Sequence, residues 1–322
     1  MSDGTELHVV FGASGGIGQA VARVLAARGK RVRAVNRSGK ADLPKEVEVR
    51  QADATDPASA GAACRGATTV YNCANAPYTE WAAKFPPIMA GLIAAAGAAG
   101  AKLIFADNLY CYGPVAGPIT EDLPYRPMGA KGRVRAQLAE TLMAAHQSGK
   151  VRAAIGRASD YYGPGVVNSF TGADMFRSLL AGKRVMWTGS LDKAHSLSFI
   201  EDFARGLVTL GERDEALGQA WHIPCAEALT GRQFLGMAFE LAGQPAKIGS
   251  YSRLFLTADG LFMPVAREAV EMLYEFEAPF VVDSGKFERV FGPSPATPHR
   301  EALGRTIAWF QAQRVSGALS AF

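Results

Sequence analysis

The stretch VVFGASGGIGQA, residues 9–20, decides how the fold is interpreted, because it satisfies two catalytic signatures at once. Gly12-Ala13-Ser14-Gly15-Gly16 fits the G-x-S-x-G nucleophile elbow of hydrolases, while Gly12, Gly15 and Gly18 fit the G-x-x-G-x-x-G loop that binds dinucleotide phosphates. Both motifs stand between a strand and a helix. The local sequence therefore leaves open whether Ser14 attacks a substrate or whether its neighbours hold a phosphate.

The place of this stretch near the start of the sequence favours phosphate binding. A nucleophile elbow usually follows an oxyanion-hole loop, and almost no sequence precedes Ser14 to supply one. A phosphate loop needs glycines for a tight turn and a close backbone approach, followed by a helix whose amides and dipole face the anion. The glycines from Gly12 to Gly18 meet this need. We therefore predict that Ser14 is not a nucleophile.

The sequence AVNRSGK, which follows the next β-branched run, indicates which dinucleotide binds. Proteins that bind NAD usually carry an acid here, whereas this chain has the neutral Asn36. Arg37 offers a bidentate fork for a 2′-phosphate, Ser38 follows it, and Ser14 becomes a hydrogen-bond donor to the same group. Asp53 is expected to bind the adenine edge. The cofactor predicted from these residues is NADP(H).

In the first half of the chain, short apolar runs rich in β-branched residues alternate with longer helical patterns. This alternation is typical of a parallel sheet with helices on both faces. Helices are expected over residues 16–28, 80–99 and about 130–148, and a further strand over 151–158. From about residue 226 the pattern changes to helices interrupted by Pro and Gly.

These patterns predict an α/β fold, a doubly wound parallel (Rossmann) sheet with a smaller, mostly helical carboxyl-terminal substrate region. Ligands of such sheets bind beyond the carboxyl ends of the strands, so substrate is expected between the two parts. The dinucleotide-binding domain is expected to cover residues 1–165 and 195–225, and the substrate-binding region 166–194 and 226–322.

Composition argues against several other classes. The net charge of +4 comes from scattered Arg and Lys, without the basic blocks of nucleic-acid-binding segments. The four cysteines and five histidines show no metal-ligand spacing, so no metal site is predicted. Residues 85–101 are uncharged but too rich in Gly and Ala for a membrane span. With no basic segment before the first apolar run, we expect a cytoplasmic protein that binds a small-molecule substrate.

Further motifs, spread over nearly the whole chain, resemble those of one known family. They are GASGGIG (12–18), ADATD (52–56), NCANA (72–76), LYCYGP (109–114), GRASDYYGPG (156–165) and SLSFIEDFARGL (196–207). The sequence resembles the extended short-chain dehydrogenase/reductase family, which includes nucleotide-sugar epimerases and dehydratases. The resemblance implies a Rossmann fold and a cofactor site formed by Gly12, Ser14, Gly15, Gly16, Ile17, Gly18, Asn36, Arg37, Ser38, Asp53, Ala54, Ala74, Lys131, Ala158, Ser159 and Tyr161.

The catalytic residues of that family are only partly present. Lys131 stands at the lysine of the family's Tyr-x-x-x-Lys pattern, but the tyrosine position holds Pro127. Asn108 falls where the family has a catalytic serine or threonine. Tyr110 lies two residues further along the same strand and so points the same way. We therefore predict Asn108, Tyr110 and Lys131 as the catalytic group, with Tyr161 as the competing proton donor.

Other polar residues are expected to have structural roles. The spacing of Tyr125 from Lys131 does not place the two on one helical face, so Tyr125 is interpreted as loop packing. Asp160, where the family often has Asn, is interpreted as hydrogen-bonded structure. His195 and His222 flank expected strands and are also assigned to structure. Arg133 and Arg135 are interpreted as surface charges.

The function predicted from the sequence is an NADP(H)-dependent oxidoreductase that transfers hydride to or from a small carbonyl or conjugated substrate. Two alternatives stay open: a non-catalytic NADP(H)-binding sensor or regulatory protein, which the missing tyrosine favours, and a nucleotide-sugar epimerase or dehydratase. A hydrolase ranks last. Substrate identity, stereochemistry and oligomeric state are left open, with a homodimer as one arrangement.

Overall fold

A seven-stranded, entirely parallel sheet forms the centre of the molecule in the computed structural model, which describes residues 6–251, 253, 256 and 270–315. Its strand order is β11-β6-β5-β4-β1-β2-β3. The order reverses beside β1, which is where the glycine loop begins. The strands are β1 (Leu7–Phe11), β2 (Arg31–Asn36), β3 (Glu48–Gln51), β4 (Ala67–Asn72), β5 (Lys102–Asp107), β6 (Arg152–Arg157) and β11 (Ala220–His222).

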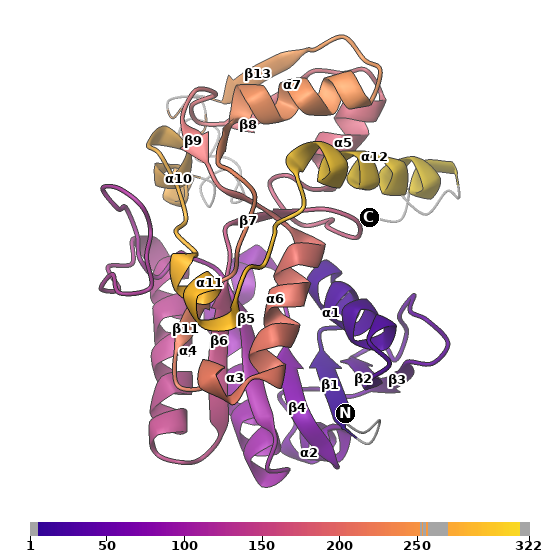
Figure 1. Ribbon diagram of the computed structural model, residues 1–322, viewed down its shortest axis with the longest axis vertical. Helices are drawn as coiled ribbons and strands as arrows, with labels where there is room; N and C mark the ends of the chain where they lie inside the picture. The colour runs from indigo at the N-terminus through magenta and orange to yellow at the C-terminus, as the bar shows by residue number, and fades with distance from the viewer. Residues whose placement is uncertain (1–5, 252, 254–255, 257–269, 316–322) are drawn as a thin grey trace.

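Helices cover both faces of this sheet, as the alternating sequence pattern predicts (Figure 1). On one face, α1 (Gly16–Ala27) packs against α6 (Ile200–Glu212). On the other face lie α2 (Pro57–Cys64), α3 (Trp81–Ala98) and α4 (Gly129–Gln147). Every residue of β1 is buried, because a strand inside a doubly covered sheet has no solvent face. The predicted α/β doubly wound fold is confirmed.

A second apolar cluster lies beyond the carboxyl ends of the strands (Figure 1). It includes Trp187, Phe176, Phe234 and Phe310, each from a different element. The elements are α5 (Ala173–Leu180), α7 (Gly231–Leu241), α12 (His299–Val315) and the parallel pair β8 (Val185–Thr188) and β13 (Ile248–Tyr251). This smaller part is mostly helical, as expected. The division of the chain into the predicted residue ranges stays a prediction.

Short elements connect the sheet to the smaller part. The segment β7 (Asp160–Tyr162) pairs in parallel with β10 (Leu197–Phe199), and β9 (Ala194–His195) pairs antiparallel with β12 (Leu229–Thr230). The helix α11 (Gly285–Phe291) packs against β11. The remaining elements are η1 (Tyr78–Glu80), η2 (Asp214–Ala216) and α10 (Tyr274–Glu277).

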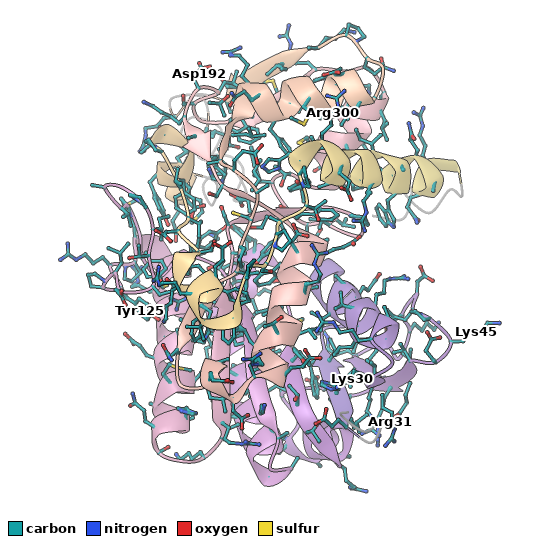
Figure 2. The ribbon with its side chains drawn as sticks, in the orientation of Figure 1. Lys30, Arg31, Lys45, Tyr125, Asp192 and Arg300 are labelled. Atoms are coloured by element: carbon teal, nitrogen blue, oxygen red, sulfur yellow. The ribbon has the colours of Figure 1, made fainter. Side chains whose placement is uncertain are left out.

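Charged side chains on the outer surface pair locally. Asp192 accepts from Arg232, and Arg300 donates to Glu240, both at the outer end of the smaller part (Figure 2). Solvent screens such exposed pairs, so they contribute little to stability. Among the helices that the structure describes, none has the length and apolar character needed to cross a bilayer.

A buried polar cluster, which we call the Arg157 network, occupies the carboxyl ends of β5 and β6. Arg157 is fully buried, and its Nε lies 3.1 Å from Asp107 Oδ2. Its two terminal nitrogens donate to the hydroxyls of Tyr112 (2.7 Å) and Tyr125 (2.6 Å). The Tyr112 hydroxyl in turn lies 2.9 Å from His222 Nε2. The network joins the sheet to the segment after β5 by satisfying every polar group of Arg157 that it buries.

Candidate functional site

The glycine loop after β1 has the geometry of a phosphate-binding turn. Gly12 has a φ of 81°, and a Cβ there would lie 2.3 Å from the carbonyl oxygen of Cys73. A Cβ on Gly18 would lie 2.4 Å from the carbonyl oxygen of Gly12, so the helix packs directly on the loop. At Gly15 the nearest atom would be 3.5 Å away, which leaves the outer side of the loop open.

The first turn of α1 is available to an anion. Gly15 is the N-cap residue, no side chain caps the helix, and the first turn holds no acidic residue. Backbone amides at such a terminus face whatever lies beyond it and favour negative charge. Ile17 stands half-buried in the same turn. Ser14 is exposed, and within the described part of the chain its hydroxyl has no hydrogen-bond partner that would activate it.

The turn after β2 uses two of its three predicted residues for its own structure. Asn36 is buried, accepts from the Ser38 amide (3.0 Å) and hydroxyl (2.9 Å), and donates to the Lys40 carbonyl (3.0 Å). Arg37 is exposed, and its guanidinium makes no hydrogen bond to the described residues. The structure therefore holds the loop through Asn36 and Ser38 and presents Arg37 to solvent.

The residues after β3 and β4 form the adjoining wall. Asp53 accepts from the Thr55 amide and hydroxyl, both at 2.8 Å, and these hydrogen bonds lower the pKa of its carboxyl. Ala54 is buried beneath α3, where a Cβ on Gly91 would lie 1.9 Å from its carbonyl oxygen. The amide of Ala74 donates to the Asn72 side chain. Asp53 is thus ionised and fixed in orientation.

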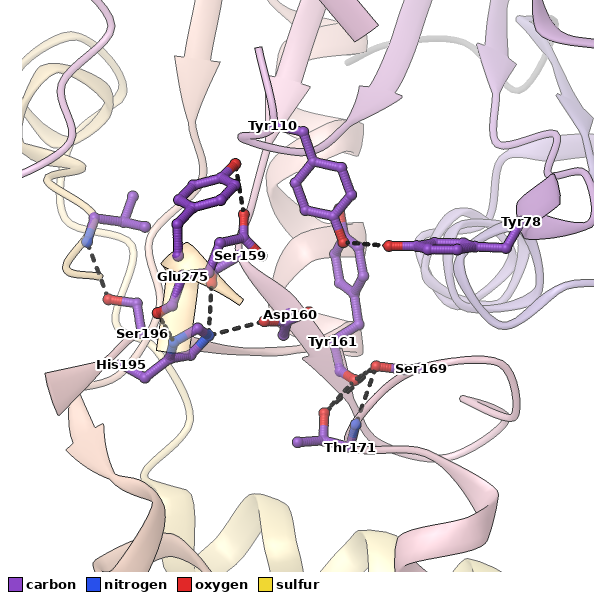
Figure 3. A network of polar contacts seen from close by, with 12 residues as sticks. Tyr78, Tyr110, Ser159, Asp160, Tyr161, Ser169, Thr171, His195, Ser196 and Glu275 are labelled. Atoms are coloured by element: carbon purple, nitrogen blue, oxygen red, sulfur yellow. Dashed lines mark hydrogen bonds and ion pairs between the residues drawn. The ribbon is translucent and has the colours of Figure 1, made fainter. Parts of the chain in front are cut away.

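Lys131, in the first turn of α4, lies against a pair of tyrosines. Its side chain is only 4% exposed, and its Nζ sits 4.4 Å from the centroid of the Tyr78 ring. The hydroxyls of Tyr78 and Tyr110 are 3.2 Å apart (Figure 3), and the Tyr110 ring stacks on Trp81. Asn108 accepts from the Tyr110 amide at 3.2 Å. Lys131 and Tyr110 therefore both contact Tyr78, a tyrosine that sequence reasoning missed, while Asn108 contacts the backbone of Tyr110. Because β5 ends just before Asn108, Asn108 and Tyr110 lie in the turn after the strand, and the expectation that both lie along one strand is wrong.

Burial governs the proton affinities in this group. It raises the pKa of Tyr110 well above the usual range of a phenol, and it lowers the pKa of Lys131. Tyr78 is 41% exposed, and its phenol keeps its proton at neutral pH without needing such a shift. A Glu271 oxygen accepts from the Lys131 amide at 2.8 Å, and the other oxygen lies 3.8 Å from Nζ. A small cavity of about 70 Å³ is lined by Tyr78 and Trp81 on one side and by Lys131 of α4 on the other. Both phenols therefore keep their protons and act as hydrogen-bond donors.

Tyr161, the competing proton donor, is bonded elsewhere. Its hydroxyl donates to the carbonyl of Asp107 at 2.9 Å, and its ring packs on Phe203. Ala158 is buried at the end of β6, and the Ser159 hydroxyl lies 3.5 Å from His195. The stretch after β6 therefore lines the site with backbone and with the edge of Tyr161.

Asp160 and His195 form a close pair beside these tyrosines (Figure 3). The distance between His195 Nε2 and Asp160 Oδ2 is 2.8 Å, and His195 Nδ1 lies 3.1 Å from the Glu275 carbonyl oxygen. The imidazole stacks on Phe276 (4.7 Å between centroids) and on Phe280 (5.3 Å). Burial, and then the nearby Asp160, raise the pKa of the Glu275 carboxyl well above its usual value. Asp160 was expected to be hydrogen-bonded, and it is.

One expectation about charges is wrong. Arg135 is buried, lies 4.3 Å from the Trp81 ring and 4.5 Å from the Phe85 ring, and pairs with Asp107 at 3.4 Å. It faces inward because that side of α4 packs on α3, where the aromatic faces and the Asp107 carboxylate compensate its charge. Arg133 is exposed, as expected.

Tyr78 and Glu275 carry no motif of their own in the sequence. Tyr78 arrives through the short turn η1 after β4, and Glu275 through α10. An available signal was the aromatic spacing of Tyr78 and Trp81, whose rings lie 4.9 Å apart. Nothing in the sequence around Glu275 distinguishes it from the surface acids of the same helix.

Comparison with known proteins identifies relatives of this chain. The sequence model of the NAD dependent epimerase/dehydratase family matches residues 8–223. No curated protein sequence matches the chain.

Three solved structures illustrate the likeness in fold. UDP-glucuronic acid 4-epimerase from Bacillus cereus, in complex with UDP-glucuronic acid and NAD, has 17% identity and a TM-score of 0.77 over 95% of this chain and 99% of that one. DesIV, a dTDP-glucose 4,6-dehydratase from Streptomyces venezuelae with NAD and TYD bound, has 19% identity and a TM-score of 0.78 over 96% and 98%. The protein gox2253 has 22% identity and a TM-score of 0.78 over 96% and 98%.

Proposed function

Because the chain belongs to the NAD dependent epimerase/dehydratase family, we propose that it binds a nicotinamide dinucleotide and acts on a nucleotide-sugar substrate. This is the epimerase or dehydratase alternative, and it replaces a reductase of small carbonyls as the preferred function. Two similar structures are named as enzymes of UDP-glucuronic acid and dTDP-glucose, which supports the substrate class. The observation that carries the proposal is the group formed by Lys131, Tyr78 and Tyr110 at the end of the parallel strands, where such folds bind their ligands.

The residues present fit the cofactor. The uncapped first turn of α1 binds the pyrophosphate, since its amides face outward and the loop at Gly15 leaves room for the anion. The Asp53 carboxylate accepts a hydrogen bond from the adenosine end of the dinucleotide. Lys131 donates a hydrogen bond to the ribose beside the nicotinamide. When bound, the dinucleotide supplies a hydride acceptor that can return the hydride later in the cycle.

The tyrosine pair serves the substrate. Since both phenols stay neutral, Tyr110 donates a hydrogen bond to the substrate oxygen, and Tyr78 orients Tyr110 through the 3.2 Å contact between their hydroxyls. Lys131 lies against the ring of Tyr78 and stabilises negative charge that develops on the oxygen. Asn108 offers its side-chain NH₂ group to the same region. This group takes the place of the absent tyrosine at Pro127.

For the cofactor we propose NADP(H) over NAD(H). The support is Arg37, whose guanidinium is exposed and makes no hydrogen bond within the described residues, beside an Asn36 that carries no repelling charge. A charge-assisted pair with a phosphate contributes about 1.5 to 3 kcal/mol. Arg37→Ala should therefore weaken NADPH binding by roughly tenfold to a hundredfold in a fluorescence titration and change NADH binding little. Equal weakening for both cofactors would refute the 2′-phosphate assignment.

The experiment that tests the function is a panel of UDP- and dTDP-linked sugars, incubated with the purified protein and each dinucleotide. We expect conversion of at least one sugar, detected by chromatography of the nucleotide sugars, and loss of at least about a hundredfold in turnover for Tyr110→Phe, since a lost proton donor costs that much. Tight NADPH binding without conversion of any sugar would instead support the non-catalytic sensor, which the proline at position 127 favours. Conversion of simple carbonyl compounds, without conversion of any nucleotide sugar, would support a reductase of small carbonyls.

A further inference from the structure

We propose that Asp160, held by His195, is the proton acceptor for the substrate hydroxyl in this site. The inference rests on the proposed function and adds to it a base that neither tyrosine can supply. Oxidation of an alcohol carbon requires that the hydroxyl proton leave as the hydride leaves, so a basic group must stand near that oxygen. Tyr78 and Tyr110 are phenols that stay protonated at neutral pH, and protonated phenols accept no further proton.

Glu271 in this region is bonded to the Lys131 amide and lies beside Lys131 Nζ, so among the described acids Asp160 is the one left for substrate. Its side chain is 13% exposed, while the neighbouring Glu275 is 1% exposed. Figure 3 shows Asp160 between His195 and the tyrosines. Two carboxyls this close favour different protonation states. Glu275 accepts from the Tyr274 hydroxyl at 3.4 Å, and burial favours its neutral form. The 2.8 Å contact with His195 Nε2 supports the charged form of Asp160.

The hydrogen bonds of His195 fix how Asp160 is held. Nδ1 faces the carbonyl oxygen of Glu275 at 3.1 Å, so that nitrogen carries a proton. Nε2 faces Asp160 Oδ2 at 2.8 Å, and this contact also needs a proton between the two atoms. The imidazole cannot turn away, because Phe276 and Phe280 lie against its faces. His195 is therefore a positioning residue that donates to Oδ2.

The other carboxylate oxygen remains for the substrate. Within the described residues, Asp160 Oδ1 has no hydrogen-bond partner. In the oxidation step the substrate O–H bond breaks and its proton moves to Oδ1, while the C–H bond on the carbon that bears this oxygen breaks and the carbon–oxygen bond becomes double. The oxidised dinucleotide, when bound, would supply the acceptor for that hydride and its electron pair. In the return step the proton passes back from Oδ1 to the oxygen, so atoms and charges balance over the cycle.

The first test needs no substrate or cofactor. In the full-length protein labelled with ¹⁵N-histidine, NMR at neutral pH should show both ring nitrogens of His195 protonated, whereas His222 should carry a proton on Nδ1 only. Asp160→Asn removes the carboxylate and should leave the Nε2 of His195 without its proton. A wild-type His195 with an unprotonated Nε2 would overturn the proposal.

The second test measures turnover of the sugar converted by the wild type. Asp160→Asn should lower kcat by about 10² to 10⁴ and leave dinucleotide affinity unchanged. The matched control is Asp192→Asn, which changes an exposed acid paired with Arg232 and should keep full activity. Retained turnover in Asp160→Asn would overturn this assignment alone. A wild-type protein that converts no sugar would overturn the proposed function first, so the two failures are distinguishable.

Discussion

His195 and His222 are anchored in similar ways, and the main difference is the group that faces Nε2. Each ends a short strand, each is buried, and each directs Nδ1 at a backbone carbonyl 3.1 Å away, that of Glu275 for His195 and that of Asp283 for His222. The two histidines differ at Nε2. The Nε2 of His222 lies 2.9 Å from the Tyr112 hydroxyl, whereas the Nε2 of His195 lies 2.8 Å from the Asp160 carboxylate.

That difference decides how many protons each imidazole carries. A tyrosine hydroxyl brings its own proton to Nε2, so His222 stays neutral, and burial and the nearby Arg157 lower its pKa to about 3. An ionised carboxylate has no proton to donate, so in the hydrogen bond between Asp160 and His195 the imidazole is the donor. The Arg157 network is closed in the sense that each side-chain nitrogen of Arg157 has an oxygen partner, while one oxygen of Asp160 has none among the described residues. A network whose polar groups are all bonded stabilises the fold. The free oxygen of Asp160, in contrast, can accept a hydrogen bond or a proton from a substrate.

The largest expected effect is the loss of a charge from the closed network. Asp107→Asn leaves both Arg157 and Arg135 without their carboxylate in the core. Breaking a buried ion pair costs about 3 to 5 kcal/mol, which should appear as a lower free energy of unfolding in urea. Asp160→Asn is the matched change in the other region, and we expect it to cost less than about 1 kcal/mol because Asn can still bond the imidazole. Equal losses of unfolding free energy in the two variants would contradict the difference between the Arg157 network and the Asp160 pair.

Acid should reveal the neutral state of His222. Its folded pKa of about 3 lies below the unfolded value of 6.5, so the unfolded chain binds the proton first as pH falls. The contribution to stability is therefore complete above pH 6.5 and is lost as pH falls towards about 3, by a few kcal/mol. His222→Gln should be less stable at pH 7 yet lose less between pH 7 and pH 4, measured by urea unfolding at each pH. An unchanged pH dependence would contradict the neutral assignment.

Two tyrosines give a finer contrast. The Tyr112 hydroxyl accepts from Arg157 and meets His222, so Tyr112→Phe leaves unsatisfied groups in the core and should cost about 1 to 3 kcal/mol of unfolding free energy. The Tyr110 hydroxyl bonds only to that of Tyr78 among the described residues, so Tyr110→Phe should change stability by less than about 1 kcal/mol. Thermal unfolding of both variants under the same conditions measures the difference in stability. A larger loss in Tyr110→Phe than in Tyr112→Phe would contradict this prediction.

The smallest effect is expected at Ser159. Its hydroxyl lies 3.5 Å from His195 Nε2, at the limit of a hydrogen bond, while Asp160 lies at 2.8 Å. Ser159→Ala should therefore change stability by less than about 0.5 kcal/mol and keep the protonated Nε2 in the NMR spectrum of His195. Loss of that proton would mean that Ser159, and not Asp160, is the partner of the imidazole.

Local patterns predicted most of the fold. The helices expected over 16–28, 80–99 and about 130–148 are observed as α1, α3 and α4, and the strand over 151–158 as β6. Periodicity succeeds here because each element buries one face or two within a sheet of regular layers. The glycine loop was also predictable, since only residues without a Cβ fit where the loop touches the backbone of Cys73.

The site was less predictable because contacts between distant segments build it. Lys131 was placed by resemblance, but its neighbour Tyr78 comes from another strand end, and no spacing rule connects the two. Arg135 was misassigned because helical charge patterns do not reveal that Trp81, Phe85 and Asp107 will meet it. His195 was expected to be structural, yet the group at its Nε2, on which its role depends, is set by pairing across β7, β9 and β10.

The aromatic packing around the site has a practical consequence for spectroscopy. Of the four tryptophans, Trp81 lies 4.9 Å from the Tyr78 ring and 6.0 Å from the Tyr110 ring, while Trp187 lies 6.4 Å edge-on to His195. Trp221 and Trp309 pack instead on Phe291 and Phe310. Indole emission responds to nearby polarity and quenchers, so the chain contains one intrinsic fluorophore on each side of its proposed reaction centre. Single-tryptophan variants would let the arrival of ligand at the tyrosine pair and at the imidazole be timed separately.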